Sequence, residues 1–472
     1  MTNLIEMKKL FFAGILLGAI VCALGLVSRA AEPASTKPDI IFLLADDLGY
    51  ADVGWHGHEI KTPVLDKLAA SGAKLDQFYV MHVCTPARAA LMTGRYPIRY
   101  GLQWNIIRPT SKYGLPLEER LLPQALRAAG YTTEMVGKWH IGSFQRAYWP
   151  NERGFDFWYG FLEGSEDYFT HQLHGKDAKL DWYLNGELKQ NDSGYSTHLF
   201  AAQAVSLIKQ QPKDKPLFLY VAFNAVHGPL QCPEEYAKLY PNLTGERQLL
   251  AGMATALDEA CGKILAALDE TGRRKNSIIV FSSDNGGIPP GKNTPLRGYK
   301  GSLYEGGIRT ATAVVWDGHI KPGQVINEPL HMVDWFPTLV KAAGGSLEQK
   351  LPLDGRDLMP VVTEGKPSPH QELLLNATPA DGAIRIGDYK LVVNGVDGVA
   401  DSLDSATGER KKGKKTGRVR GVKLNKMELF NLRDDPSETK NLADQMPDKV
   451  KELRARYDEY YKAAVQPLNL VR

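Results

Sequence analysis

The chain has 472 residues, of which 43% are hydrophobic and 24% charged, a composition that excludes a disordered or fibrous protein. A chain of this length is longer than one hydrophobic core usually accommodates, which predicts a large domain and a smaller one. The net charge of +3 is local, because residues 408–426 carry nine Lys or Arg and one acid. The remaining chain has 48 basic and 53 acidic residues and is therefore net acidic. Because the sequence also contains no nucleic-acid-binding motif, a nucleic-acid partner is a poor interpretation.

Residues 1–32 are typical of a secretory signal. Two lysines precede an apolar run at residues 10–27, and small residues suited to cleavage follow at 28–31. A membrane anchor is the alternative, since about 18 apolar residues can span a bilayer. The cleavage-like end favours a removed signal, and we expect no stable membrane anchor.

Three cysteines remain after the expected signal: Cys84, Cys232 and Cys261. Cys232 and Cys261 could form a disulfide in an oxidising compartment, but Cys261 lies in a helical pattern and is equally typical of a small core residue. The sparse cysteines and the lysines that open the signal favour a bacterial exported protein, periplasmic or extracellular.

Apolar runs of strand length alternate with helical patterns through residues 33–368. Continuous apolar runs indicate strands buried on both faces, and the alternation predicts an α/β fold with a mostly parallel sheet. The expected strands are residues 39–45, 131–136, 216–223 and 277–282; the expected helices are residues 62–71, 121–129 and 253–268 and one that starts near residue 86.

The pattern changes near residue 369. Short strand-like stretches at residues 383–393 and 427–432 precede a helical pattern at residues 447–464. We therefore expect a smaller α+β subdomain at residues 369–472, with the basic stretch 408–426 as an insertion.

Polar side chains follow the end of each of the four expected strands. In chain order they are Asp46 and Asp47, Lys138 and His140, His227, and Asp284 and Asn285. Because sites in open α/β sheets form at the carboxyl ends of strands, we expect these side chains to lie together. A glycine-punctuated loop after the last strand adds Lys300. Each lysine or histidine alone is more typical of a solvated or ordinary core residue.

Asp46, Asp47, Asp284 and Asn285 offer hard oxygen ligands. Such ligands suit Ca²⁺ or Mg²⁺ rather than zinc. Either pair alone is more typical of a turn. Together they favour a cation site.

Cys84 opens the stretch Cys84-Thr85-Pro86-Ala87-Arg88, which leads into an apolar run. Proline suits the first turn of a helix, so the cysteine is expected at the helix N-terminus, where unpaired N–H groups favour an anion or a nucleophile. A merely buried or reactive cysteine is the alternative.

Followed by Thr93-Gly94-Arg95, this stretch resembles the signature of the type I, formylglycine-dependent sulfatases. Further segments are most similar to the arylsulfatase B group, the N-acetylgalactosamine 4-sulfatases. These segments are residues 94–103, 137–140, 164–168 and 295–298. The resemblance implies an alkaline-phosphatase-like fold with a small antiparallel C-terminal sheet.

The resemblance also implies the cofactors. Cys84 would be oxidised to formylglycine by a formylglycine-generating or anaerobic sulfatase-maturating enzyme. One Ca²⁺, rather than Mg²⁺, would be held by Asp46, Asp47, Asp284 and Asn285, with the residue made from Cys84 completing the shell.

Roles for the remaining polar residues follow from the resemblance. Arg88 and Lys138 would hold the formylglycine hydrate, and Lys138 and Lys300 would bind the sulfate oxygens. His227 would protonate the leaving oxygen, helped by Lys300. His140 would deprotonate the second hydroxyl of the sulfated enzyme and expel sulfate. A thiol offers no second hydroxyl, so unmodified Cys84 would not complete this cycle.

The implied substrate is a sulfated oligo- or polysaccharide carrying 4-O-sulfated galactosamine or galactose. The match loosens at residues 104–108 and 112–114, where specificity would be set. Two alternatives stay open: a phosphate or phosphonate monoester hydrolase of the same fold, and a catalytically silent glycan-binding homologue. The basic stretch 408–426 is either a solvated insertion or a loop that attracts a polyanionic glycan.

Overall fold

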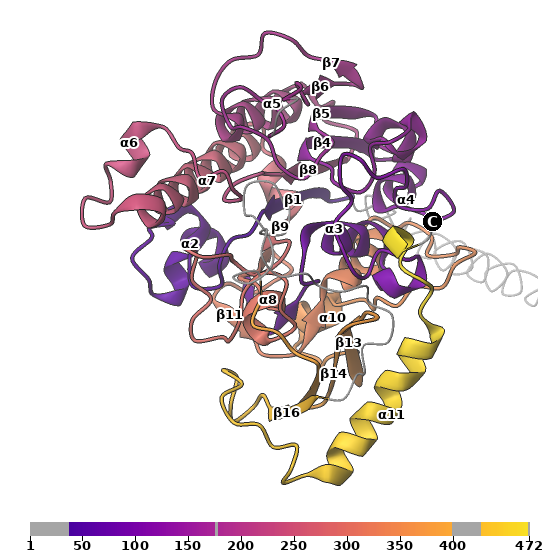
Figure 1. Cartoon of the computed structure of the whole chain (residues 1–472). Coiled ribbons are helices and arrows are strands. Elements are labelled where there is room, and N and C mark those ends of the chain that lie inside the picture. The colour runs from indigo at the N-terminus through magenta and orange to yellow at the C-terminus, as the bar shows by residue number, and fades with distance from the viewer. Residues whose placement is uncertain (1–36, 175–177, 399–425, 471–472) are drawn as a thin grey trace, which may run out of the picture. The chain divides into compact units, whose positions relative to one another are not determined.

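A ten-stranded sheet organises the residues that the structure, a computed structural model, describes: 37–174, 178–398 and 426–470. Its strand order is β11-β2-β10-β9-β1-β8-β4-β5-β6-β7 (Figure 1). The central parallel strands are β9 (Ser277–Ser283), β1 (Asp39–Ala45), β8 (Leu217–Ala222), β4 (Thr132–Lys138) and β5 (Phe157–Phe161). The outer strands are β2 (Ala73–Leu75), β6 (Tyr183–Leu184), β7 (Glu187–Leu188), β10 (Ala313–Trp316) and β11 (Gln324–Ile326). This confirms the mostly parallel α/β sheet.

Strand β1 shows why these apolar runs become central strands. Its side chains alternate between the two faces of the sheet, and each face is covered by helices. Ile40, Phe42 and Leu44 join one apolar core, while Ile41 and Leu43 join the other. All five are fully buried.

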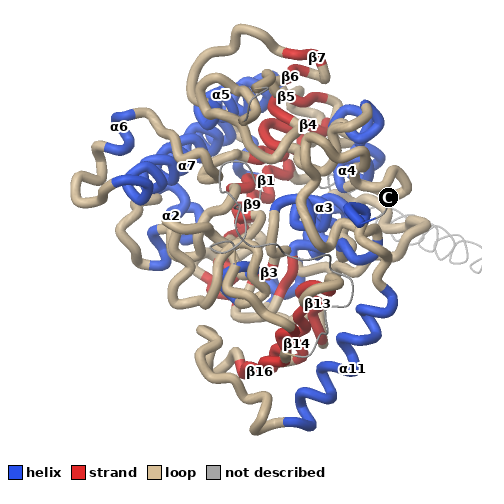
Figure 2. The backbone as a smooth tube through the Cα atoms, in the orientation of Figure 1, coloured by secondary structure: helices blue, strands red, loops and turns tan. Residues whose placement is uncertain are grey.

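The two faces carry different helices (Figure 2). One face is covered by α2 (Pro63–Ala70), α5 (Ser196–Gln210) and α7 (Gly245–Glu270). The other is covered by α3 (Cys84–Thr93), α4 (Leu122–Ala128), α9 (Trp335–Ala342) and α10 (Met359–Glu364). Two short helices, α6 (Glu234–Ala237) and α8 (Glu305–Ile308), lie in connecting segments, and β3 (Phe78–Tyr79) pairs with β12 (Leu330–His331). Helix α5 has no counterpart among the expected elements.

A second, antiparallel sheet follows in the chain. It contains β13 (Glu372–Ala377), β14 (Gly382–Ile386), β15 (Tyr389–Val393) and β16 (Met427–Asn431), and α11 (Pro447–Ala463) packs on it. These elements confirm the expected small antiparallel sheet and terminal helix. The division at residues 368 and 369 stays a prediction, and the expected signal and nearly all of the basic stretch 408–426 lie outside the described residues.

Within the described ranges, no helix has both the length and the apolar composition needed to cross a bilayer. Cys232 and Cys261 are both free, and Cys261 lies buried in α7. The structure therefore does not form the disulfide that the sequence left open.

A buried ion network ties the small sheet to the main one. The Nζ atom of Lys390 on β15 lies 2.9 Å from Glu305 Oε1 at the start of α8 and 2.8 Å from Glu438 Oε1. The three side chains are almost completely buried. The backbone N–H of Glu305 also donates to Glu438 Oε2, at 2.6 Å. Since Glu305 ends the loop that carries Lys300, this network holds one border of the site described below.

We expect Lys390→Met to lower the free energy of unfolding by about 3–5 kcal/mol, because buried Glu438 loses its cation and buried Glu305 keeps only the longer ion pair with Arg309, at 3.5 Å. The matched control is Lys341→Met, which removes a half-exposed lysine 3.3 Å from Asp357 and should cost at most about 1 kcal/mol. Urea unfolding of both variants measures the difference. Equal losses would show that the network does not stabilise the fold.

Candidate active site

The candidate site lies at the carboxyl ends of the four adjacent parallel strands β9, β1, β8 and β4. The register pairs Ala45 with Ser283, so β1 and β9 end at the same level. Asp46 and Asp284 therefore leave the sheet side by side, and the Asp284 N–H donates to the Ala45 carbonyl. Every polar segment that the sequence placed after a strand reaches this edge.

Cys84 is the first residue of α3, which begins two residues earlier than expected. Its Sγ atom lies 3.7 Å from Asp46 Oδ1, and the residue is 1% exposed. Burial raises the pKa of the Cys84 thiol to about 12, although Lys138 and Lys300 act in the opposite direction. The unmodified side chain is therefore a protonated thiol at neutral pH rather than an activated thiolate.

Arg88 lies one helical turn after Cys84 and points into the same cluster. Its Nη2 atom is 2.9 Å from Asp284 Oδ2 and 3.3 Å from Asp46 Oδ2. Nε also donates to Asp284, and Nη1 donates to the Lys138 carbonyl at 3.2 Å. The guanidinium thus joins the ends of β1, β4 and β9.

Two lysines neutralise the remaining carboxylate charge. Lys138 Nζ is 2.5 Å from Asp46 Oδ2, and Lys300 Nζ is 2.7 Å from Asp47 Oδ1. Burial alone would raise the pKa of both aspartates, but the lysines and His227 outweigh burial and hold these pKa values below the ordinary range. Burial likewise acts to lower the pKa of Lys300, yet Asp47 holds it above its usual value.

The oxygen donors of the site fit a hard divalent cation. Asp46, Asp47, Cys84 and His227 each offer a ligand atom, all within 4.8 Å of one another, and the two carboxylates among them supply hard oxygen ligands. Beside them, Asn285 Nδ2 donates to Asp47 Oδ1, while Asn285 Oδ1 is buried and accepts no hydrogen bond from the part of the chain that the structure describes. A buried carbonyl oxygen without a partner next to carboxylates is suited to a Ca²⁺ or Mg²⁺ ligand.

The formal charges of this cluster sum to zero. Asp46, Asp47 and Asp284 are balanced by three cations, which are Arg88, Lys138 and Lys300. A divalent cation would make the cluster positive. Such a buried positive site attracts an anionic ester and stabilises charge that develops on its oxygens.

His227 follows β8 and faces the same carboxylates. Its Nε2 atom is 3.6 Å from Asp47 Oδ2, and Nδ1 is 2.7 Å from the Gly228 carbonyl, an arrangement that fixes Nδ1 as the protonated donor. The side chain is 15% exposed, whereas Cys84 and Lys138 are almost completely buried. Burial and Lys300 lower the pKa of His227. His227 therefore lies where the cluster opens to solvent.

His140 follows β4 but does not continue its extended backbone. Lys138 ends β4, and His140 has a φ of 57°. The ring Nε2 lies 2.9 Å from the Ile107 carbonyl, and Nδ1 is buried without a hydrogen-bond partner among the described residues. Burial and the charges of Lys138 and Arg88 hold the pKa of His140 well below its usual range, so Nδ1 keeps a free lone pair.

Residues that the sequence reasoning missed hold His140 in place. The Thr85 hydroxyl donates to the His140 carbonyl and accepts the Ile107 N–H, both at 3.0 Å. A Cβ at Gly164 would lie 2.7 Å from His140 Cε1, so only glycine fits against this ring. Thr85 stands inside the Cys84 motif, which was the one available signal for its role.

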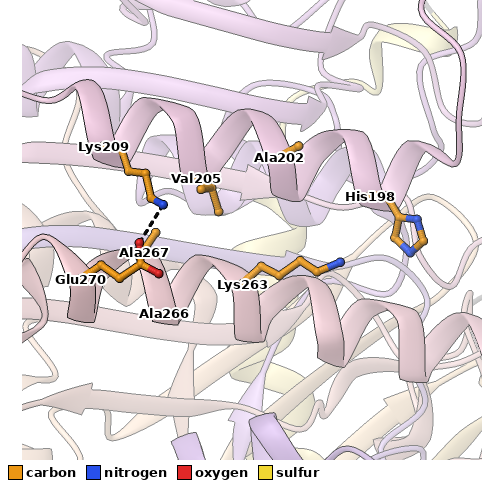
Figure 3. Close-up of a pocket in the computed structure, with 8 residues that line it drawn as sticks. All are labelled: His198, Ala202, Val205, Lys209, Lys263, Ala266, Ala267 and Glu270. Atoms are coloured by element: carbon orange, nitrogen blue, oxygen red, sulfur yellow. Dashed lines mark ion pairs between the residues drawn. The ribbon is translucent and has the colours of Figure 1, made fainter.

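The segments that resemble arylsulfatase B contain buried polar side chains. Gln103, Glu166 and Tyr168 are each 1% exposed. Trp104 and Asn105, where the resemblance loosens, are partly exposed. A separate surface cavity of about 480 Å³ lies between α5 and α7, where Lys209 pairs with Glu270 at 2.7 Å (Figure 3). None of the candidate site residues lines it.

Comparison with known proteins gives consistent results. The family model described as Sulfatase matches residues 38–346. Mouse arylsulfatase J is 40% identical over 468 residues, covering 93% of this chain and 78% of that protein. Rat N-acetylgalactosamine-6-sulfatase is 33% identical over 74% of this chain and 70% of its own length.

Among solved structures, Ps i-CgsB in complex with k-i-k-neocarrahexaose has a TM-score of 0.79 and 32% identity, covering 91% of this chain and 94% of that one. PsFucS1 sulfatase from Pseudoalteromonas sp. has a TM-score of 0.73 and 26% identity, covering 91% and 92%. With the family match and the alkaline-phosphatase-like arrangement of its sheet, this chain belongs to the sulfatase family and is a sulfuric ester hydrolase.

Proposed function

We propose that this protein removes sulfate from a sulfated glycan, at 4-O-sulfated galactosamine or galactose, using a formylglycine made from Cys84 and one Ca²⁺. The observation that carries the proposal is the convergence of Arg88, Lys138 and Lys300 on the carboxylates around Cys84. The glycan class is supported by a structural neighbour in complex with k-i-k-neocarrahexaose and by relatives named N-acetylgalactosamine-6-sulfatase. The 4-position rests on the sequence resemblance to the arylsulfatase B group.

The geometry suits each step of ester cleavage. A formylglycine hydrate at position 84 would supply the nucleophilic oxygen, and a cation held by the neighbouring carboxylates would supply positive charge beside it. The Lys138 and Lys300 ammonium groups, which pair with Asp46 and Asp47, would hold the sulfate oxygens. Because Nδ1 of His227 donates to a carbonyl, the imidazolium form would give its Nε2 proton to the leaving oxygen.

His140 is suited to the second proton transfer. Its Nε2–H donates to Ile107, and its Nδ1 lone pair is free. A neutral, buried imidazole with an unpartnered nitrogen can accept a hydroxyl proton and so assist sulfate release. His227 and His140 would therefore act as acid and base in successive steps.

The two alternatives fit the site less well. A two-metal phosphatase needs ligands for a second ion about 4 Å away, and the described residues hold one such group of acidic, His and Cys ligands. A silent glycan-binding homologue would not need the paired cations and carboxylates that are assembled here. Export of the chain, maturation by a partner enzyme and attraction of the glycan by residues 408–426 are further parts of the proposal.

Calcium should stabilise the protein through the carboxylates. At a hundredfold excess over its dissociation constant, Ca²⁺ should add about 2.7 kcal/mol to the free energy of unfolding. Asp284→Asn should abolish this gain. The control is Asp334→Asn, the same change at another fully buried carboxylate, which should retain it. Thermal unfolding with Ca²⁺ or Mg²⁺ measures the effect, and a gain that survives Asp284→Asn would contradict the ligand set.

The rate of sulfate release from an oligosaccharide should depend on which ring position carries the sulfate. The matured enzyme should release sulfate from oligosaccharides that carry galactosamine 4-sulfate at the non-reducing end faster than from matched 6-sulfated ones. An oligosaccharide with only internal 4-sulfate separates a closed pocket from an open cleft. Faster release from the 6-sulfate would overturn the 4-position and leave the sulfatase chemistry intact.

A further inference from the structure

The short segment 224–227 ends in His227, and backbone hydrogen bonds to Asp46 hold the residues before His227 next to the end of β1. Asp46 exchanges backbone hydrogen bonds with Ala225 and Val226, at 2.9 and 2.7 Å. His227 lies beyond these bonds, and its own N–H donates to the Asn224 carbonyl. Its imidazole makes one hydrogen bond shorter than 3 Å, to the neighbouring Gly228 carbonyl. The position of the imidazole therefore depends on what fixes the His227 backbone.

Tyr168 supplies that restraint from a different part of the chain. Its hydroxyl lies 2.5 Å from the Asn224 carbonyl and 2.8 Å from the His227 carbonyl. Both carbonyls belong to the turn that presents the imidazole. One phenol thus spans the turn and joins its two ends.

A second pair of contacts extends the same restraint past His227. The Tyr168 N–H donates to Gln231 Oε1 at 2.9 Å, and Gln231 Nε2 donates to Asp167 Oδ2 at 2.7 Å. On the other side, the Ser196 N–H donates to the Tyr168 carbonyl, and Ser196 bonds the Asn224 side chain. Tyr168 is therefore tied to both sides of the turn.

Tyr168 itself is rigid enough to act as a reference point. It is 1% exposed, and its ring stacks on Tyr195 with centroids 5.4 Å apart and planes 20° apart. Burial holds the pKa of Tyr168 well above its usual range, so the hydroxyl keeps the proton that it donates. In the described residues, the Tyr195 hydroxyl makes no hydrogen bond to segment 224–227.

We propose that Tyr168 is a positioning residue that aims His227 at the leaving oxygen through its hydrogen bonds to the carbonyls of Asn224 and His227. The inference rests on the proposed role of His227 as the proton donor. The proposal gives a function to segment 164–168, which resembles arylsulfatase B. Tyr168 in this segment is buried, so it would act through the protein and not by contacting solvent.

The test compares aryl sulfates whose leaving groups differ in their need for a proton. 4-Nitrophenolate leaves readily without one, whereas phenolate needs protonation more. In Tyr168→Phe, we expect kcat on phenyl sulfate to fall on the order of tenfold, and kcat on 4-nitrophenyl sulfate to change by less than about twofold, with KM unchanged on both. A loss of activity from general destabilisation would affect both esters equally.

Matched variants make the outcome specific. Tyr195→Phe removes a stacked, buried hydroxyl that holds nothing in the turn and should leave both rates unchanged. Gln231→Ala cuts the outer contacts without touching the core, and should give a smaller loss with the same dependence on leaving group. It carries the test if Tyr168→Phe does not fold.

His227→Ala distinguishes the proton-donor role of His227 from the positioning role of Tyr168. If the rate loss in this variant depends strongly on the leaving group, the proton-donor role of His227 is confirmed. Equal losses on both esters in Tyr168→Phe and in Gln231→Ala would then overturn the positioning proposal alone. If His227→Ala itself slows both esters equally, the role of His227 is wrong, and the proposal for Tyr168 falls with it.

Discussion

The structure depends on a neutral cluster of buried charges at the ends of parallel strands. Three carboxylates would be costly in an apolar interior, and three cations from different parts of the chain offset that cost. Arg88 comes from a helix, Lys138 from a strand and Lys300 from a loop, so the charges also fix how these elements meet. With this balance, one divalent cation would make the site positive and able to bind an anion, so the same charges would serve both the fold and the proposed chemistry.

Much of this site could be predicted because its residues follow local rules. Buried parallel strands are continuous apolar runs, and the polar residues after them must share one edge. Asp46, His227 and Asp284 were placed on this basis. His140 was placed by the same rule, but its left-handed backbone was not predicted, because a positive φ cannot be derived from a Lys-Trp-His pattern. The ligand type alone also leaves Ca²⁺ and Mg²⁺ unresolved.

The supporting contacts could not be predicted, because they join residues far apart in the sequence. Lys390 stands 85 residues after Glu305, and nothing local indicates that they pair. In the sequence, Tyr168 is indistinguishable from an ordinary aromatic core residue. Only the structure shows that its hydroxyl bonds the His227 carbonyl, 59 residues away. Substrate specificity could not be predicted from local sequence either. Gln103 and Glu166 lie in segments that resemble arylsulfatase B, yet both are almost completely buried, so the resemblance alone does not identify the side chains that would contact a sugar.

The most direct test of the account is hydrolysis of 4-nitrophenyl sulfate and 4-nitrophenyl phosphate by the matured enzyme and by Cys84→Ala. Mass spectrometry of the Cys84 peptide would establish that the thiol has become an aldehyde or its hydrate. We expect the matured enzyme to cleave the sulfate ester faster than the phosphate ester, and Cys84→Ala to lose this turnover while remaining folded. Equal sulfate hydrolysis by Cys84→Ala, or faster cleavage of the phosphate ester, would contradict it.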